Sequence, residues 1–422
     1  MVTEKPRFLV VGASIAGLTV ANGLLQTCDC EVIVFERSSE SETGRLPKNG
    51  GGIGLHEESV KILKSLGIST EYALPMNIYE DRDRTGRIIR KTKIPFFSAF
   101  WGDVHRHLLD GAISAGAIVL YNKNVTSIDE RDDGVSVGFS NDAARYDGDC
   151  VIGADGILST LRSLMFTDNS INMETDLVRH AGYYAWRGLV PLEDMPANAE
   201  LTFRKGIFTI ELSYKSHAIM YYLPRGLNWL IYFNSNSEAT STYHRSDEIV
   251  GQITRTATDA ELEELYRTVE LLYRPAVVDL IKASQRPLPF TNQMYDRKSL
   301  STFSTNRCIL IGDAAHPSTP HHLRGSNMAI ADGFVLAKEF AFTLNGKCND
   351  LKNSAAVKDV FSRFESQRLK LCNDIVIHSA RIGRVRQSVY CKDKQGPHWD
   401  TCCESSELTE MLGDQNYVTA LE

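Results

Sequence analysis

The sequence predicts an α/β fold in which a parallel sheet of the doubly wound kind is interrupted by an antiparallel sheet domain and then resumed. An apolar strand, a glycine turn and a helix open the chain. Shorter alternating blocks rich in aromatic and β-branched residues cover about residues 178 to 235. A near-continuous apolar strand returns at residues 308–311, as expected for a parallel sheet covered on both faces. The 422 residues suffice for two or three such domains.

Composition and charge exclude several classes of protein. Lys and Arg total 46 against 53 Asp and Glu, a formal charge of −7, and there is no dense basic stripe, so we expect no nucleic-acid partner. The nine cysteines contain no CxxC pair, which favours reduced thiols and a cytoplasmic location. No signal peptide or transmembrane segment is recognisable. A monomer and a homodimer both remain open.

The first strand, turn and helix carry the pattern of a phosphate cradle. The six-residue segment that begins at Gly12, GASIAG, follows the strand and opens the helix, where backbone N–H groups can face a pyrophosphate. Glu36 closes the next strand, where an acidic side chain can accept hydrogen bonds from a ribose. The predicted cofactor-binding residues here are Gly12, Ser14, Ile15, Ala16, Gly17, Glu36 and Arg37. A hydrolase nucleophile elbow is the rival reading, but Ala16 stands where that motif needs glycine.

Two later strand ends carry similar motifs. The segment GADGILSTLR places Asp155 after an apolar strand, and IGDAAHPSTP places Asp313 after the strand at residues 308–311. An aspartate at the carboxyl edge of a parallel sheet can accept hydrogen bonds from ligand hydroxyls. The second motif continues through Pro320 to a glycine-led helix start at Gly325. All three motifs are therefore expected to meet at one edge of the sheet.

Together and in this order, GASIAG with Glu36, GADGILSTLR and IGDAAHPSTPHHLRGSNMAIADG resemble the fingerprints of class A single-component FAD-dependent aromatic hydroxylases. The resemblance covers about residues 7 to 375 and implies the para-hydroxybenzoate hydroxylase fold, a Rossmann-like FAD-binding domain with an interleaved antiparallel-sheet substrate domain. YYAWRGLVPL and SHAIMYYLP are most similar to the 2,6-dihydroxypyridine and 6-hydroxynicotinate hydroxylase branch. The chain departs from the family at Leu323 and Arg324, where glycine and glutamine are usual.

The resemblance implies FAD as cofactor and NADH or NADPH as a transient co-substrate. It implies a monooxygenase that hydroxylates an electron-rich phenolic or N-heteroaromatic small molecule with O2 through a C4a-hydroperoxyflavin. The further residues that it assigns to the cofactor are Arg45, Gly52, Arg106, Asp155, Asp313, Pro320, Gly325, Ser326, Asn327 and Met328. A flavin-dependent reductase or halogenase on the same scaffold, or a non-catalytic flavin-binding redox sensor, is the alternative function.

Candidate catalytic residues lie on the strand at residues 216–223. Its period of two places His217 and Tyr221 on one face and Tyr222 on the other. We expect His217 to act as a base or orienting group and Tyr221 to bind the substrate. The alternative, a solvent-facing His217 with Tyr221 in the core, stays open.

Further candidates come from other segments. His321, beside Pro320, is a third catalytic candidate, and Arg187, Tyr222 and His56 are weaker substrate candidates. No metal is expected. An iron site at Asp313, His316, His321 and His322 is disfavoured because Asp313 is better placed to hold a ligand from its strand end.

The expected domain organisation alternates between the two units. Residues 1–75, 101–175 and 291–375 are assigned to the FAD-binding domain. Residues 76–100 form a substrate-side insertion, 176–290 the substrate sheet domain, and 376–422 a C-terminal helix and tail.

Overall fold

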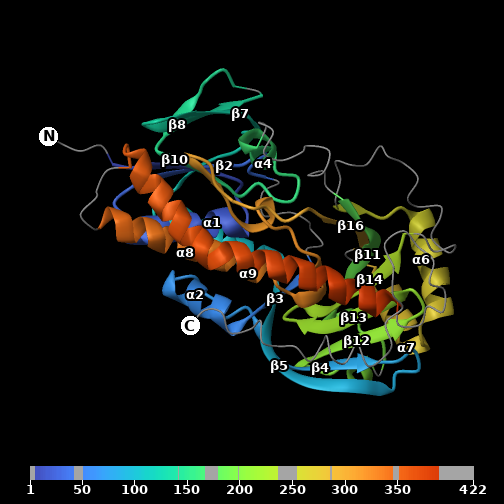
Figure 1. The fold of residues 1–422 in the computed structure, drawn as a ribbon. Coiled ribbons are helices and arrows are strands. Elements are labelled where there is room, and N and C mark those ends of the chain that lie inside the picture. Colours follow the sequence, from blue (N-terminus) through green and yellow to red (C-terminus); the bar gives the residue numbers. More distant parts are fainter. Residues whose placement is uncertain are drawn as a thin grey trace.

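A computed structural model describes most of the chain. The residues described are 5–41, 51–140, 142–166, 179–197, 199–235, 254–285, 288–345 and 351–388. They form two lobes around two main sheets, one five-stranded and one nine-stranded (Figure 1).

The first lobe is built on the parallel sheet, in the order β17-β10-β1-β2-β6. Its strands are nearly all buried and apolar, which suits a sheet covered on both faces. The strands are β1 (Arg7–Val11), β2 (Glu31–Phe35), β6 (Ile118–Leu120), β10 (Cys150–Gly153) and β17 (Cys308–Leu310). The helices that join this lobe's core are α1 (Ile15–Thr27), α2 (Glu57–Ser65), α3 (Trp101–Ser114), α4 (Thr160–Met165), α8 (Gly325–Leu344) and the first part of α9 (Ser354–Ser388).

The second lobe is built on the nine-stranded sheet, in the order β15-β16-β11-β14-β13-β12-β4-β5-β3. Its pairs are antiparallel except β12 with β4, which is parallel. The strands are β3 (Gly52–Leu55), β4 (Leu74–Arg82), β5 (Ile88–Phe100), β11 (Arg179–Pro191), β12 (Ile207–Ser213), β13 (Ser216–Leu223), β14 (Gly226–Asn234), β15 (Thr254–Thr256) and β16 (Phe290–Asp296).

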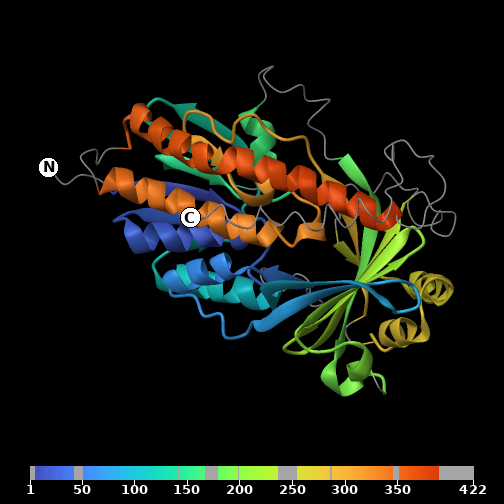
Figure 2. The same cartoon turned by 60° about the horizontal axis from the view of Figure 1, so that its bottom comes forward.

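Alternate side chains of this sheet enter two different cores. One face packs against α6 (Asp259–Leu272) and α7 (Pro275–Lys282), which lie on the outer side of the lobe (Figure 2). The opposite face carries a second cluster that includes Ile219, Tyr221 and Tyr232. Because neighbouring residues on a strand point to opposite faces, β11, β13 and β14 each contribute to both cores.

The long helix α9 (Ser354–Ser388) runs beside α8 and then crosses to the nine-stranded sheet, as both views show (Figures 1 and 2). Its last turns place Ile382 and Val385 in the cluster on the inner sheet face. None of the described helices has the length and apolar character that crossing a membrane would take.

The remaining elements are short. They are the small sheet β7 (Val125–Arg131), β8 (Gly134–Phe139) and β9 (Tyr146–Gly148), the helix α5 (Ala199–Thr202), and the 3-10 turns η1 (Leu192–Asp194), η4 (Gly312–Ala314) and η5 (Pro320–His322). The turns η4 and η5 follow β17 and lead into α8.

The predicted fold class is confirmed, with an interleaved parallel and antiparallel architecture. Three elements differ from the expected organisation. The large sheet includes β3, within the stretch 1–75 assigned to the other domain, and β16, beyond the boundary expected at residue 290, and α9 continues without a break through residue 375. The tail from 389 to 422 lies outside the described residues.

Candidate functional site

A pocket of about 410 Å³ opens at the carboxyl ends of β1, β2 and β10. Ligands of open α/β sheets bind at this edge, where the strand order switches direction. Glycine-turn, acidic and aromatic side chains from segments far apart in the sequence form its wall. They include Gly12, Ala13, Ser14, Glu36, Arg37, Gly51, Trp101, His105, Asp155 and Arg187.

The glycine turn brings backbone close to backbone. Gly12 has a φ of +106°, and a Cβ there would lie 2.4 Å from the carbonyl oxygen of Ala154. A Cβ at Gly17 would lie 2.0 Å from the carbonyl oxygen of Gly12. Ser14 precedes α1 and its hydroxyl makes no cap hydrogen bond. The N-terminus of α1 can therefore face an anionic group, with the Ser14 hydroxyl at the pocket wall.

The Glu36 carboxylate connects the glycine turn after β1 to the segment after β2. It accepts hydrogen bonds from the backbone N–H groups of Ala13, at 3.0 Å, and Ser38, at 2.9 Å. Each carboxylate oxygen has a further lone pair, so Glu36 can still accept from a ribose hydroxyl. Arg37 also lines the pocket. Ile15, Ala16 and Gly17 are buried at the start of α1 and support the turn from behind.

The structure brings Trp101 and His105 to the pocket and leaves Arg106 outside it. Arg106 pairs with Asp103 at 3.0 Å and its side chain is 57% exposed. His105 donates from Nε2 to the carbonyl oxygen of Ala13 at 2.7 Å, and its ring stacks on Trp101. Residues 101 and 105 are one helical turn apart and share a face, whereas residue 106 is rotated away. That i, i+4 spacing is the signal that sequence reasoning missed.

Two aspartates stand at the predicted strand ends. Asp155 accepts from the Ser159 hydroxyl at 2.5 Å and from the N–H of Thr160 at 2.7 Å, so it also caps the start of α4. Burial raises the pKa of Asp155. Desolvation by the surrounding protein likewise raises the pKa of Asp313, although this residue keeps contact with water. A Cβ at Gly325 would lie 3.9 Å from Asp313 Oδ1, so these two predicted residues are adjacent.

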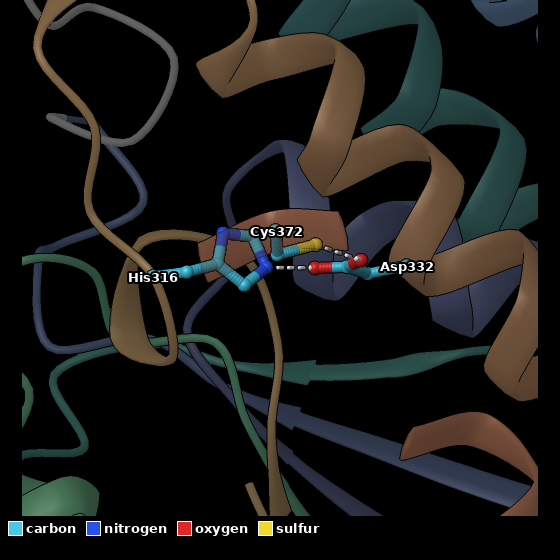
Figure 3. Close-up of side chains that lie close together, drawn as sticks. All are labelled: His316, Asp332 and Cys372. Atoms are coloured by element: carbon cyan, nitrogen blue, oxygen red, sulfur yellow. Dashed lines mark hydrogen bonds and ion pairs between the residues drawn. The ribbon is translucent and has the colours of Figure 1, made fainter. Parts of the chain in front are cut away.

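A buried ion network holds the segment that follows β17 in place (Figure 3). Asp332 of α8 accepts from His316 Nε2 at 2.6 Å, from Arg368 Nε at 2.7 Å and from the N–H of Gly312 at 2.9 Å. Cys372 donates to the same carboxylate at 3.8 Å. Although His316, Asp332 and Cys372 lie close enough to share a metal ion, two cations already satisfy the carboxylate. We therefore interpret the cluster as a structural network joining η4, α8 and α9.

The inner face of the nine-stranded sheet carries the predicted catalytic histidines. His217 is fully buried, and neither ring nitrogen has a hydrogen-bond partner among the described residues. Its ring stacks on Tyr232 at 4.6 Å and lies 5.2 Å from the ring of His321, centroid to centroid. His321 Nδ1 lies 3.3 Å from the Tyr183 hydroxyl, and its Nε2 has no partner. Packing of η5 against β13 thus brings the two imidazoles together among tyrosine rings.

Electrostatics keeps both imidazoles neutral. Burial, and then the charges of His321 and Arg386, lower the pKa of His217 well below its ordinary value. Burial and Arg386 do the same to the pKa of His321. A neutral imidazole with a free nitrogen can accept a proton.

Tyr221 and Arg187 approach the loop that leads into β3. A Cβ at Gly52 would lie 2.4 Å from the Tyr221 hydroxyl, and a Cβ at Gly51 would lie 2.7 Å from the guanidinium carbon of Arg187. Arg187 Nη2 donates to the carbonyl oxygen of Gly52 at 3.4 Å. These glycines therefore let the substrate lobe touch the cofactor pocket directly.

The other predicted residues have different surroundings. Tyr222 lies on the opposite face of β13, in the outer core, so the structure does not bring it to the site. Asn327 donates to the carbonyl oxygens of Gly54 and Leu323 and accepts from the N–H of His56, which makes it a clamp between β3 and α8. Arg45 lies outside the described residues.

The loop between η5 and α8 also holds the two departures from the family pattern. Leu323 adopts a φ of 53°, in the left-handed region that a leucine rarely enters. Its side chain packs toward Gly54. Pro320 begins η5, and Met328 is buried in the first turn of α8. Burial lowers the pKa of Arg324.

A nucleotide cradle on a parallel sheet, joined to an aromatic-lined face of a second sheet, defines a two-lobed flavoprotein of the hydroxylase class. The match to a family model agrees, since residues 7–178 and 201–356 fit the family described as FAD binding domain. The chain belongs to this family, and FAD is its cofactor.

Curated relatives and solved structures resemble the chain over most of its length. The 3-amino-4-hydroxybenzoate 2-monooxygenase of Streptomyces platensis is 29% identical, covering 79% of each chain. The 6-hydroxynicotinate 3-monooxygenase of Bordetella bronchiseptica is 24% identical, covering 94% of each. The structure of 2,6-dihydroxypyridine-3-hydroxylase from Arthrobacter nicotinovorans superposes with a TM-score of 0.74 at 22% identity, covering 91% of this chain and 93% of that one. The resemblance read from the sequence is confirmed.

Replacing Gly12 by alanine should weaken FAD binding. The added Cβ meets the carbonyl oxygen of Ala154 and the φ of +106° is unfavourable, a strain of about 1–3 kcal/mol. Gly116→Ala is the matched control, because Gly116 has a φ of +105° and nothing within 4 Å of the added Cβ. Flavin content and FAD titration should separate the two variants, and equal FAD affinity in both would contradict the cradle.

Proposed function

We propose that the chain is a FAD-dependent monooxygenase that hydroxylates a small, electron-rich phenolic or N-heteroaromatic compound with NADH or NADPH and O2. One observation carries the proposal. His217, buried and without a hydrogen-bond partner on either nitrogen among the described residues, lies on the same sheet face as Tyr221, which packs against Gly52, the neighbour of the pocket-lining Gly51. A buried polar group without a partner costs about 1–3 kcal/mol. A substrate hydroxyl would supply that partner.

FAD, when bound and reduced, supplies the oxygen-transfer chemistry. The residues that would hold it are the α1 N-terminus, Glu36, Asp155 and Asp313. The chain's own task is to orient an aromatic ring and to withdraw its hydroxyl proton. His217 accepts this proton at a ring nitrogen, because burial keeps the imidazole neutral. The aromatic residues around it exclude water from the reacting ring.

Tyr221→Phe and Tyr222→Phe form a matched pair on one strand. Tyr221 faces the proposed substrate site and Tyr222 faces the outer core. Loss of one hydrogen bond of about 0.5–1.5 kcal/mol should raise KM by about two- to tenfold in Tyr221→Phe only. Steady-state kinetics checks this, and an equal rise in both variants would contradict the assignment of faces.

The proposal is tested by screening phenols, aromatic acids, pyridines and quinolones against the purified yellow protein. The expected result is that one class accelerates NAD(P)H consumption and O2 uptake and is recovered with one added oxygen atom. Consumption that yields only hydrogen peroxide with every compound would overturn the proposal and favour the redox-sensor alternative. Halide-dependent product would favour a halogenase.

The cysteines support a reducing location. Cys28, Cys30, Cys150, Cys308 and Cys372 are free thiols, and burial raises the pKa of Cys28, Cys30, Cys150 and Cys308. Thiols held in this form are poorly reactive. We infer that the enzyme works in the cytoplasm.

A further inference from the structure

The last turn of α9 carries a buried cation that the proposed chemistry does not use. Arg386 is only 3% exposed. Its Nη1 donates to the carbonyl oxygen of His321 at 3.3 Å, and its Nε has no partner among the described residues. Among the described residues, no carboxylate oxygen lies within 4.0 Å of the Arg386 guanidinium, the distance limit of an ion pair. A buried guanidinium without an ion pair is costly, so such a group usually has an anionic partner.

The charges around Arg386 leave a net positive site. Asp81 is the acidic group whose charge acts on Arg386, but its Oδ2 already accepts from Arg90 Nε at 2.6 Å. Asp81 is therefore engaged by Arg90 and forms no ion pair with Arg386. Burial lowers the pKa of Arg386, and its neighbours His217 and His321 are kept neutral. An anionic ligand group would supply the missing ion-pair partner of Arg386.

The position of Arg386 is fixed against the proposed substrate face. A Cβ at Gly383 would lie 2.6 Å from His321 Nδ1, so α9 presses directly on the η5 loop. Ile382 and Val385 belong to the same cluster as Tyr221 and Tyr232. Gln387 follows, fully buried, and neither atom of its amide has a partner among the described residues. Uncompensated polar groups thus concentrate where α9 meets the histidine pair.

We propose that Arg386 binds the carboxylate of the aromatic substrate, at the end of the site next to His217 and His321. The inference rests on the proposed function and narrows its substrate class to aromatic acids. A guanidinium and a carboxylate form paired, charge-assisted hydrogen bonds that also fix orientation. Arg187 and Arg324 are further cations near the site, but Arg187 lies against Gly51 and Gly52 at the cofactor pocket, and Arg324 precedes α8 on the far side of His321 and Leu323 in the chain. Arg386 is consequently a specificity residue, while His217 acts on the ring hydroxyl.

The test compares acids with their own amides in the FAD-loaded protein. Benzoate and nicotinate are paired with benzamide and nicotinamide, and binding is followed by flavin absorbance and by thermal shift. Wild type should bind each acid at least about tenfold more tightly than its amide, the usual scale of a charge-assisted contact. Arg386→Gln should bring this ratio to about one with amide affinity unchanged, and Arg386→Lys should restore part of it. Arg381→Gln, an exposed arginine on the same helix, is the matched control and should keep the wild-type ratio.

A wild-type acid preference that survives in Arg386→Gln would overturn the proposal. If hydroxylation of an aromatic compound continued in that case, the proposed function would stand and only the subsite would fall. If wild type hydroxylated no aromatic compound at all, the proposed function would fail and take the substrate assignment with it. Thermal shift in the absence of ligand shows whether Arg386→Gln is folded, and Arg386→Lys provides a second, charged variant for the same comparison.

Discussion

His217→Ala is expected to slow hydroxylation by about 10²–10⁴-fold, the usual contribution of a positioned base, while flavin reduction by NAD(P)H continues unchanged. The physical reason is that His217 is a buried neutral imidazole with no hydrogen-bond partner on either nitrogen among the described residues, whereas the neighbouring His321, 5.2 Å away ring to ring, has one nitrogen near the Tyr183 hydroxyl. Substrate consumption and hydrogen peroxide should be measured together. Reductant should still be consumed, with peroxide replacing product.

Two further variants separate chemistry from packing. His217→Phe keeps an aromatic ring against Tyr232 but removes both nitrogens, so it should uncouple as His217→Ala does. His180→Ala removes an exposed histidine at the far end of β11 and should leave product yield unchanged. Wild-type coupling in His217→Phe would exclude His217 as the base.

Asp332→Asn is expected to destabilise the protein by about 3–5 kcal/mol, because breaking a buried ion pair leaves its partners uncompensated. His316 and Arg368 would both lose their counter-charge in a region that is almost fully buried. Asp374→Asn is the control, since Asp374 pairs with Lys370 on the surface of α9 at 2.5 Å and should cost less than about 1 kcal/mol. Urea unfolding measures both, and equal losses would contradict the structural role of the network.

The same network predicts a pH dependence. Burial alone would raise the pKa of Asp332, but His316 and Arg368 hold it below its ordinary value. The ionised Asp332 carboxylate therefore contributes its full stabilisation of the folded state above about pH 4, and this stabilisation is lost as the pH falls further. Burial alone would lower the pKa of His316, but Cys372 and Asp332 raise it well above its ordinary value. The protonated His316 therefore contributes its full stabilisation of the folded state below about pH 6.5, and this stabilisation is lost as the pH rises through the raised pKa. Urea unfolding of Asp332→Asn at several pH values should not show this loss.

Local sequence patterns predicted the strand, turn and helix that open the parallel-sheet lobe. Gly12, Ser14 and Glu36 lie where strand, turn and helix follow one another directly, so their relative positions depend on few residues. The alternation along β13 likewise predicted that Tyr221 and Tyr222 face opposite ways. A shift of one residue on a helix turns a side chain by about 100°, which local patterns do not resolve. Trp101 and His105 line the pocket, and the neighbouring Arg106 pairs with Asp103.

The sequence by itself therefore determined the fold class, the FAD family and the edge of the sheet where the three motifs meet. Only the tertiary structure decided which side chains share the inner face of the large sheet, how Asp332 joins three segments, and that Arg386 reaches His321. The physical reason is distance along the chain. A strand or helix start is specified by a few neighbouring residues, whereas His217, His321 and Arg386 meet only after β13, η5 and α9 have packed together.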